Sequence, residues 1–112
     1  MNNREYTDYL DDIYNSINDI EDFIKDLSFN EFSKDKKTLN AVIRSLEIIG
    51  EASKKIPVEF KEKFPAIPWN KMSGMRNKLI HEYFGIDIEM LWIVITKDIQ
   101  DLKSVFKKII ED

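Results

Sequence analysis

The sequence predicts an all-α protein, folded as an up-and-down bundle of four to five helices. Apolar residues recur three or four positions apart along most of the chain, which is the spacing of one face of a helix. No segment alternates apolar and polar residues between hairpin turns, so no β-sheet is expected. All three prolines lie between residues 57 and 68, and a proline disrupts a helix interior. We therefore expect two long helices before this stretch and two after it.

The first helix is expected at about residues 4–27. Its apolar residues alternate spacings of four and three positions, which is close to a coiled-coil seam and predicts one buried face. These residues are Tyr6, Leu10, Ile13, Ile17, Ile20, Ile24 and Leu27. The acidic residues concentrate on the other faces of this helix, where they are expected to face solvent. Residues 28–30 are expected to break the helix.

The second helix is expected at roughly residues 34–56. Its buried side is predicted to carry Leu39, Val42, Ile43, Leu46, Ile49, Ala52 and Ile56. Gly50 lies within this pattern, and a glycine inside a helix costs about 1 kcal/mol relative to alanine, which suggests that another backbone approaches it closely. Pro57 is expected to end the helix. Pro65 and Pro68 are expected to keep the next stretch irregular or only briefly helical.

The third helix is expected from Trp69 or Asn70 to Phe84. Asn70 is the predicted N-cap and Gly85 the predicted stop. The apolar stripe of this helix consists of Met72, Met75 and Leu79.

A fourth helix is expected at about residues 88–111. Asp87 is its predicted N-cap, because a short acidic side chain can accept a hydrogen bond from the first turn. Its predicted apolar stripe is Ile88, Leu91, Trp92, Ile95, Ile99, Leu102, Phe106 and Ile109.

The composition limits the kinds of site that the chain can carry. Its length predicts one domain over residues 1–112. Cysteine is absent and His81 is the only histidine, so we expect no disulfide and no thiolate or histidine-rich metal site. Carboxylates could still hold magnesium or calcium, but no calcium-loop spacing is visible, and we predict no metal site and no cofactor. No segment resembles a signal peptide or a membrane span, which indicates a cytoplasmic protein without a membrane partner. The net charge of −4 argues against a broad electrostatic grip on nucleic acid, but leaves room for a small basic site.

The stretch from Arg76 to Tyr83 holds an arginine, a carboxamide, a histidine and a phenol within about two helical turns. Asn77 and His81 are four residues apart and share one helix face. Arg76 and His81 lie about 140° apart on an ideal helix, so they would flank the edge of a groove. A histidine and a fixed cation together suit the chemistry of a phosphate ester. The alternative is a partly buried structural histidine beside a surface arginine.

RNA cleavage shows what such a site would need. One group takes the proton from a 2′-OH, a second protonates the leaving 5′-oxygen, and a cation stabilises the charge that develops between them. One chain offers a single histidine. A two-fold homodimer would bring two histidines and two arginines together, and such a shared site would need no metal.

Other polar and aromatic residues are weaker candidates. Arg44, Glu47 and Glu51 are predicted to form a solvated face, with an ion-pair network or a dimer seam as the alternative. Trp69 and Trp92 are expected to be core or interface anchors rather than platforms for bases. Nine lysines are available for phosphate contacts, although most are expected only to keep the protein soluble. They are Lys34, Lys36, Lys37, Lys54, Lys55, Lys61, Lys63, Lys71 and Lys78.

These motifs, taken in order, resemble the HepT-like proteins of the HEPN superfamily over nearly the whole chain. The matching residues are Phe32 and Asp35, the run Ala41–Ala52, Ile67–Trp69, Gly74–Asn77 and His81–Phe84. An arginine, four residues, a histidine, one residue and a tyrosine match the family motif without a gap.

The resemblance implies an all-α homodimer that acts as a metal-independent ribonuclease toxin of a type VII toxin–antitoxin pair. It also implies a partner, a minimal nucleotidyltransferase of the MntA type, which neutralises the toxin by adding AMP to the motif tyrosine. On this resemblance, Arg76 and His81 would be catalytic and Asn77 would support the site. Tyr83 would accept AMP, and transfer RNA is a candidate target. Because some HEPN proteins bind nucleotides or partners without cleaving RNA, a non-catalytic binding module is the alternative.

Overall fold

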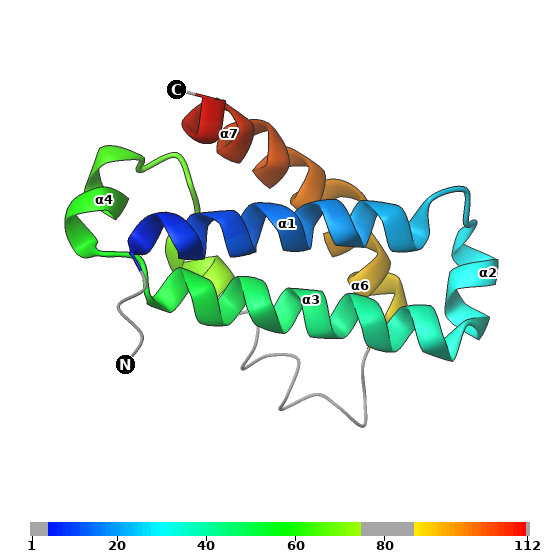
Figure 1. Ribbon diagram of the computed structural model, residues 1–112. Coiled ribbons are helices and arrows are strands. Elements are labelled where there is room, and N and C mark those ends of the chain that lie inside the picture. Colours follow the sequence, from blue (N-terminus) through cyan, green and yellow to red (C-terminus); the bar gives the residue numbers. More distant parts are fainter. Residues whose placement is uncertain (1–4, 75–86, 112) are drawn as a thin grey trace.

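The computed structural model describes residues 5–74 and 87–111 (Figure 1). Every regular element within these two ranges is a helix, which confirms the predicted all-α class. In the described part of the chain, no helix is long and apolar enough to cross a membrane.

Two long helices, α1 (Tyr6–Ile24) and α3 (Lys36–Lys54), lie side by side and run in opposite directions (Figure 1). They bury the middle of each predicted apolar stripe. The fully buried side chains from this pair include Ile13, Ile17, Ile20, Val42, Leu46 and Ile49. The first stripe ends earlier than predicted, because α1 stops at Ile24 and Asp26 then takes a φ of 62°, which turns the chain out of the helix.

A short helix, α2 (Phe29–Lys34), joins the two long ones. The chain breaks after α1 as predicted, but at residues 25–28 rather than 28–30, because Phe29 and Asn30 already belong to α2. The Ser28 hydroxyl accepts a hydrogen bond from the Glu31 amide at 3.1 Å, and the Ser28 amide donates one to Glu31 Oε1 at 3.0 Å. This reciprocal capping box starts a helix at the position that was expected to end one. The hydrogen bond from the Ser28 amide and, as a smaller effect, a hydrogen bond from the Ser28 side chain lower the pKa of the Glu31 carboxyl.

Helix α3 begins at Lys36, two residues later than predicted, because Asp35 is its N-cap. Asp35 accepts hydrogen bonds from the amide and the hydroxyl of Thr38, at 3.1 and 2.6 Å. Helix α4 (Val58–Lys63) then follows Pro57, and its six residues agree with the brief helix expected in the proline-containing stretch.

The C-terminal helix begins where it was predicted, but it is not one regular helix. Helix α6 (Ile88–Ile93) passes through a π-helical segment, Val94–Asp98, into α7 (Ile99–Glu111). The predicted stripe nevertheless stays in the core, where Leu91, Ile95 and Ile99 are all buried. These three residues are four positions apart, and two such steps rotate by about 80° on an ideal α-helix. The wider π turn reduces this drift, so all three side chains reach the core.

Candidate functional site

The four residues predicted to carry the chemistry, Arg76, Asn77, His81 and Tyr83, all lie outside the described residues. The predicted stripe residues Met75 and Leu79 and the predicted stop Gly85 lie outside them as well. The mutual geometry of the predicted site therefore stays a prediction. The structure does describe both places where this stretch joins the rest of the chain.

The N-terminal junction is anchored by Trp69. Residues 69–74 are helical, and the Pro68 carbonyl accepts a hydrogen bond from the Met72 amide at 3.0 Å. Trp69 is only 8% exposed, and its indole Nε1 donates to the Phe64 carbonyl at 3.1 Å. The predicted N-cap at Asn70 is wrong, because the helix already includes Trp69 and leaves Asn70 exposed in the first turn.

Aromatic packing fixes this junction against two other helices. The Trp69 ring lies edge-on to Phe106 of α7, with 5.9 Å between the ring centres, and edge-on to Phe60 of α4 at 6.3 Å. Contacts of this geometry are favourable for aromatic pairs. The prediction that Trp69 is a core anchor is confirmed, and so is that for Trp92, which packs on Phe32 with 5.0 Å between the ring centres.

The C-terminal junction is anchored by Asp87, the predicted N-cap of α6. Asp87 Oδ1 accepts a hydrogen bond from the Met90 amide at 3.1 Å, and the Asp87 carbonyl accepts one from the Leu91 amide at 2.9 Å. Leu91 is buried one turn later. The stretch that holds the predicted site is thus joined at each end to a residue fixed in the bundle.

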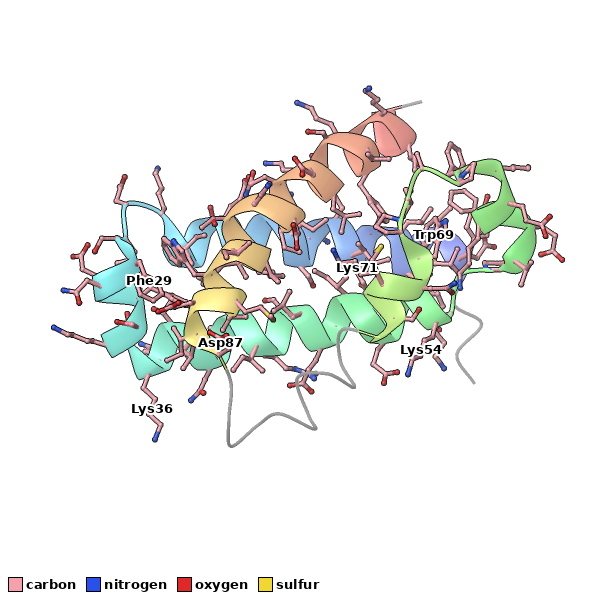
Figure 2. All side chains as sticks on the ribbon, turned by 180° about the vertical axis from the view of Figure 1, so that it is seen from behind. Phe29, Lys36, Lys54, Trp69, Lys71 and Asp87 are labelled. Atoms are coloured by element: carbon pink, nitrogen blue, oxygen red, sulfur yellow. The ribbon has the colours of Figure 1, made fainter. Side chains whose placement is uncertain are left out.

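The described surface next to the N-terminal junction is hollowed by a groove of about 460 Å³. We call it the Trp69 groove. Its walls include Val58, Lys61, Pro65, Pro68, Trp69 and Lys71. Figure 2 shows Trp69 and Lys54 near one end of the molecule, whereas Phe29 and Lys36 lie at the opposite end.

Two smaller hollows lie elsewhere. One, of about 260 Å³, runs between α7 and the segment holding Lys71, where the Lys71 ammonium lies 3.7 Å from an Asp98 carboxylate oxygen. The other, of about 160 Å³, lies between α1 and α3 and includes Arg44. Arg44 lies 4.0 Å from Glu47, on an exposed face, which agrees with the solvated face predicted there.

The comparison with known families identifies the group to which the chain belongs. Residues 13–109 match the family described as Ribonuclease HepT-like. This chain belongs to the HepT-like ribonuclease family. The resemblance drawn from the sequence motifs is therefore confirmed. Residues 13–109 include all four predicted site residues.

The relatives support the same assignment. A probable ribonuclease HepT of Thermococcus cleftensis is 53% identical over 106 residues, which cover 95% of this chain and 96% of that protein. A putative RNase of Methanocaldococcus jannaschii is 50% identical over 113 residues, covering 100% of this chain and 93% of the relative. A putative RNase of Caldanaerobacter subterraneus is 44% identical over 103 residues, covering 92% of each. No solved structure matches the chain significantly.

Sequence reasoning treated Lys61 and Lys71 as two of nine dispersed lysines and missed that both line one groove. They are ten positions apart, on either side of Pro65 and Pro68. The prolines were a signal for a chain reversal, which would bring the two lysines together. The sequence alone did not show that Trp69 would line the same groove as the two lysines.

Among the described residues, no three histidine, cysteine, aspartate or glutamate side chains gather as a metal site.

Proposed function

We propose that this protein is a metal-independent endoribonuclease toxin of a type VII toxin–antitoxin pair, acting in the cytoplasm as a homodimer. The observation that carries the proposal is its membership of the HepT-like ribonuclease family together with an ungapped Arg76, His81 and Tyr83 motif. The two buried anchors, Trp69 and Leu91, support it further, because a catalytic stretch needs rigid elements on both sides.

The proposed reaction is an internal transesterification of RNA. A histidine takes the proton from a 2′-OH, and the 2′-oxygen then forms a bond to the adjacent phosphorus. The bond from phosphorus to the 5′-oxygen breaks, and an acid protonates this leaving oxygen. The products are a 2′,3′-cyclic phosphate and a 5′-OH end. His81 supplies the proton transfer, and Arg76 stabilises the negative charge on the phosphoryl oxygens.

A homodimer supplies the second proton-transfer group. Each chain contributes one histidine, whereas the reaction uses a base and an acid. Two-fold symmetry brings in the second His81 and the second Arg76. Asn77 lies four residues before His81 in the sequence, so on a helix it would share a face with His81 and hold the imidazole in a productive orientation.

Neutralisation by an MntA-like nucleotidyltransferase follows from the same arrangement. In this step the Tyr83 oxygen would form a bond to the α-phosphorus of ATP, with release of pyrophosphate and of the hydroxyl proton. The attached AMP would bring a phosphate and an adenine to the cleft. The AMP phosphate would pair with Arg76 through charge-assisted hydrogen bonds, and the adenine would occupy space needed by RNA. The modified protein would then bind RNA more weakly.

RNA cleavage in EDTA tests the proposal, using total transfer RNA with wild type and His81→Ala side by side. We expect cleavage by wild type and at least a 100-fold loss in the variant, which is about the contribution of a general acid or base. Circular dichroism and the dimer mass would show that the variant keeps its fold. Mass spectrometry would first show that Tyr83 carries no AMP. Absence of cleavage by unmodified wild type would favour the non-catalytic binding module.

A further inference from the structure

Positive charge gathers next to the Trp69 groove, although the chain as a whole is acidic. The net charge of the protein is −4. Residues 54–71, however, hold five lysines and only two acidic residues, Glu59 and Glu62. This stretch contains all the residues that line the groove. Of the charged residues that line the groove itself, Lys61 and Lys71 are basic and Glu62 is acidic, so the groove carries a small excess of positive charge that would attract a polyanion.

Two lysines that line the groove, Lys61 and Lys71, each make one weak contact within the protein. The Lys61 ammonium lies 6.0 Å from the centre of the Trp69 ring, within the range of a weak cation–π contact. The Lys71 ammonium makes only a long contact of 3.7 Å with Asp98, on an exposed side chain, and such pairs contribute little. Both ammonium groups remain available to an incoming anion.

Five of the other residues that line the groove are apolar, and Glu62 and Asn70 are polar. Val58 is 63% exposed. Its aliphatic side chain therefore presents apolar surface to solvent. Pro65, Pro68 and the Trp69 ring continue this apolar surface. A volume of about 460 Å³ is within the range of sites that hold a small molecule or a single nucleotide. Cations beside an apolar wall match a nucleotide, whose phosphate is charged and whose base has an apolar face.

We infer that the Trp69 groove binds single-stranded RNA beside the cleaved bond, with Lys61 and Lys71 on phosphates and the apolar wall against one base. This inference rests on the proposed ribonuclease function. Lys71 precedes Arg76 by only five residues in the chain, so RNA held in the groove is close along the chain to the proposed catalytic residues. Binding of this type reads the backbone and the face of a base, and it gives little sequence preference.

Binding of a fluorescent, unstructured RNA at several salt concentrations tests the inference. All variants would carry His81→Ala, so that cleavage does not disturb the measurement. Lys61→Gln/Lys71→Gln should weaken binding about tenfold at low salt and reduce the slope of log K against log salt by about 1.4, since each lost phosphate contact on a single strand removes about 0.7. Lys61→Arg/Lys71→Arg should bind like the parent, because the charge is kept.

The chain offers a matched control at the far end of the bundle. Lys34→Gln/Lys36→Gln removes the same charge from exposed lysines of α2 and α3, and Lys36 is remote from Trp69 (Figure 2). Binding should change less than about threefold in this control. An equal loss in both double variants would overturn the inference, because net charge alone would then explain it. Parental affinity and salt slope in Lys61→Gln/Lys71→Gln would overturn it as well.

The two levels of the proposal fail separately. Cleavage by the protein with His81 intact, measured in parallel, reports on the ribonuclease function alone. If that protein cleaves RNA and the groove variant cleaves equally well at low RNA concentration, the groove is not the binding surface and the ribonuclease proposal stands. If no cleavage occurs but RNA binding depends on Lys61 and Lys71, the groove is an RNA-binding surface and the ribonuclease proposal fails.

Discussion

An ion pair connects the C-terminal helix to the first one. The Lys103 ammonium of α7 lies 2.6 Å from Glu21 Oε1 of α1, and the two side chains are 28% and 31% exposed. The hydrogen bond to Glu21 raises the pKa of Lys103. A lysine whose pKa is raised by folding stabilises the folded state at pH values below its unfolded pKa, and loses this effect as the pH rises through the folded pKa.

A double-mutant cycle measures this pair. Glu21→Gln, Lys103→Gln and the double variant should give a coupling free energy of about 0.5–1 kcal/mol in urea unfolding at pH 7. The same cycle on Arg44 and Glu47, which are 4.0 Å apart, should give about zero. The coupling free energy between Glu21 and Lys103 should disappear as the pH rises above the ordinary lysine pKa of 10.5. Equal coupling free energies in the two pairs would contradict the larger contribution that we predict for Glu21 and Lys103.

At the scale of the elements, α2 depends on the capping box of Ser28 and Glu31. Ser28→Ala should lower the free energy of unfolding by about 1 kcal/mol, because it removes the hydroxyl oxygen that accepts a hydrogen bond from the Glu31 amide. Ser104→Ala is the matched control, because the Ser104 hydroxyl makes only a long 3.4 Å bond on an exposed helix face. Chemical denaturation of both variants would show the difference. Equal stabilities would mean that the cap contributes nothing.

The capping box also predicts a response to acid. Because the pKa of Glu31 is lowered in the folded protein, its contribution is present above the unfolded pKa and is lost as the pH falls through the lowered value. The difference in stability between wild type and Glu31→Gln should therefore shrink as the pH falls below the ordinary value of 4.5. A difference that stays constant from pH 7 to pH 3 would contradict this account of the cap.

The π-helical segment sets which residues of the last helix face the core. Ile95 is fully buried within it, whereas Ile93, two positions earlier, is 55% exposed. Ile95→Ala should cost about 2–5 kcal/mol of stability, as for other large-to-small changes in cores. Ile93→Ala should change stability by less than about 0.5 kcal/mol. Thermal unfolding of both variants checks the register, and similar losses would contradict it.

Much of this arrangement was visible in the sequence. The seam of α1, the cap at Asp87 and the core stripe of the last helix follow from periodicity and from one short side chain at a helix start. Helix α2 was missed although Ser28 and Glu31 stand in capping-box spacing. The π-helical segment was missed because its cause lies in tertiary packing. Leu91, Ile95 and Ile99 are four positions apart, and all three side chains must stay in the core.

The candidate site was only partly predictable for a different reason. Arg76 and His81 were chosen by residue type and spacing, which identify chemistry but not distance. The Trp69 groove arises from segments that are separated by two prolines, and no periodic pattern links them. A surface that is assembled by packing, as this groove is by Trp69 on Phe106 and Phe60, is not encoded in local spacing.

The whole molecule combines an acidic helical bundle with a proposed site for a reaction on RNA. The acidic residues concentrate on α1, and the lysine-rich stretch surrounds the Trp69 groove. Such a division would favour one orientation of RNA on the surface over the others. The proposed homodimer would then add a second histidine to complete the acid–base pair.

The chemical nature of the RNA ends shows whether the protein cleaves RNA by a transesterification that depends on His81. The ends would be identified by mass spectrometry after digestion of a defined RNA in EDTA, with wild type and His81→Ala in parallel. We predict 2′,3′-cyclic phosphate and 5′-OH ends with wild type and almost none with the variant. Ends with a 5′-phosphate, or equal cleavage by the two proteins, would contradict a transesterification that depends on His81.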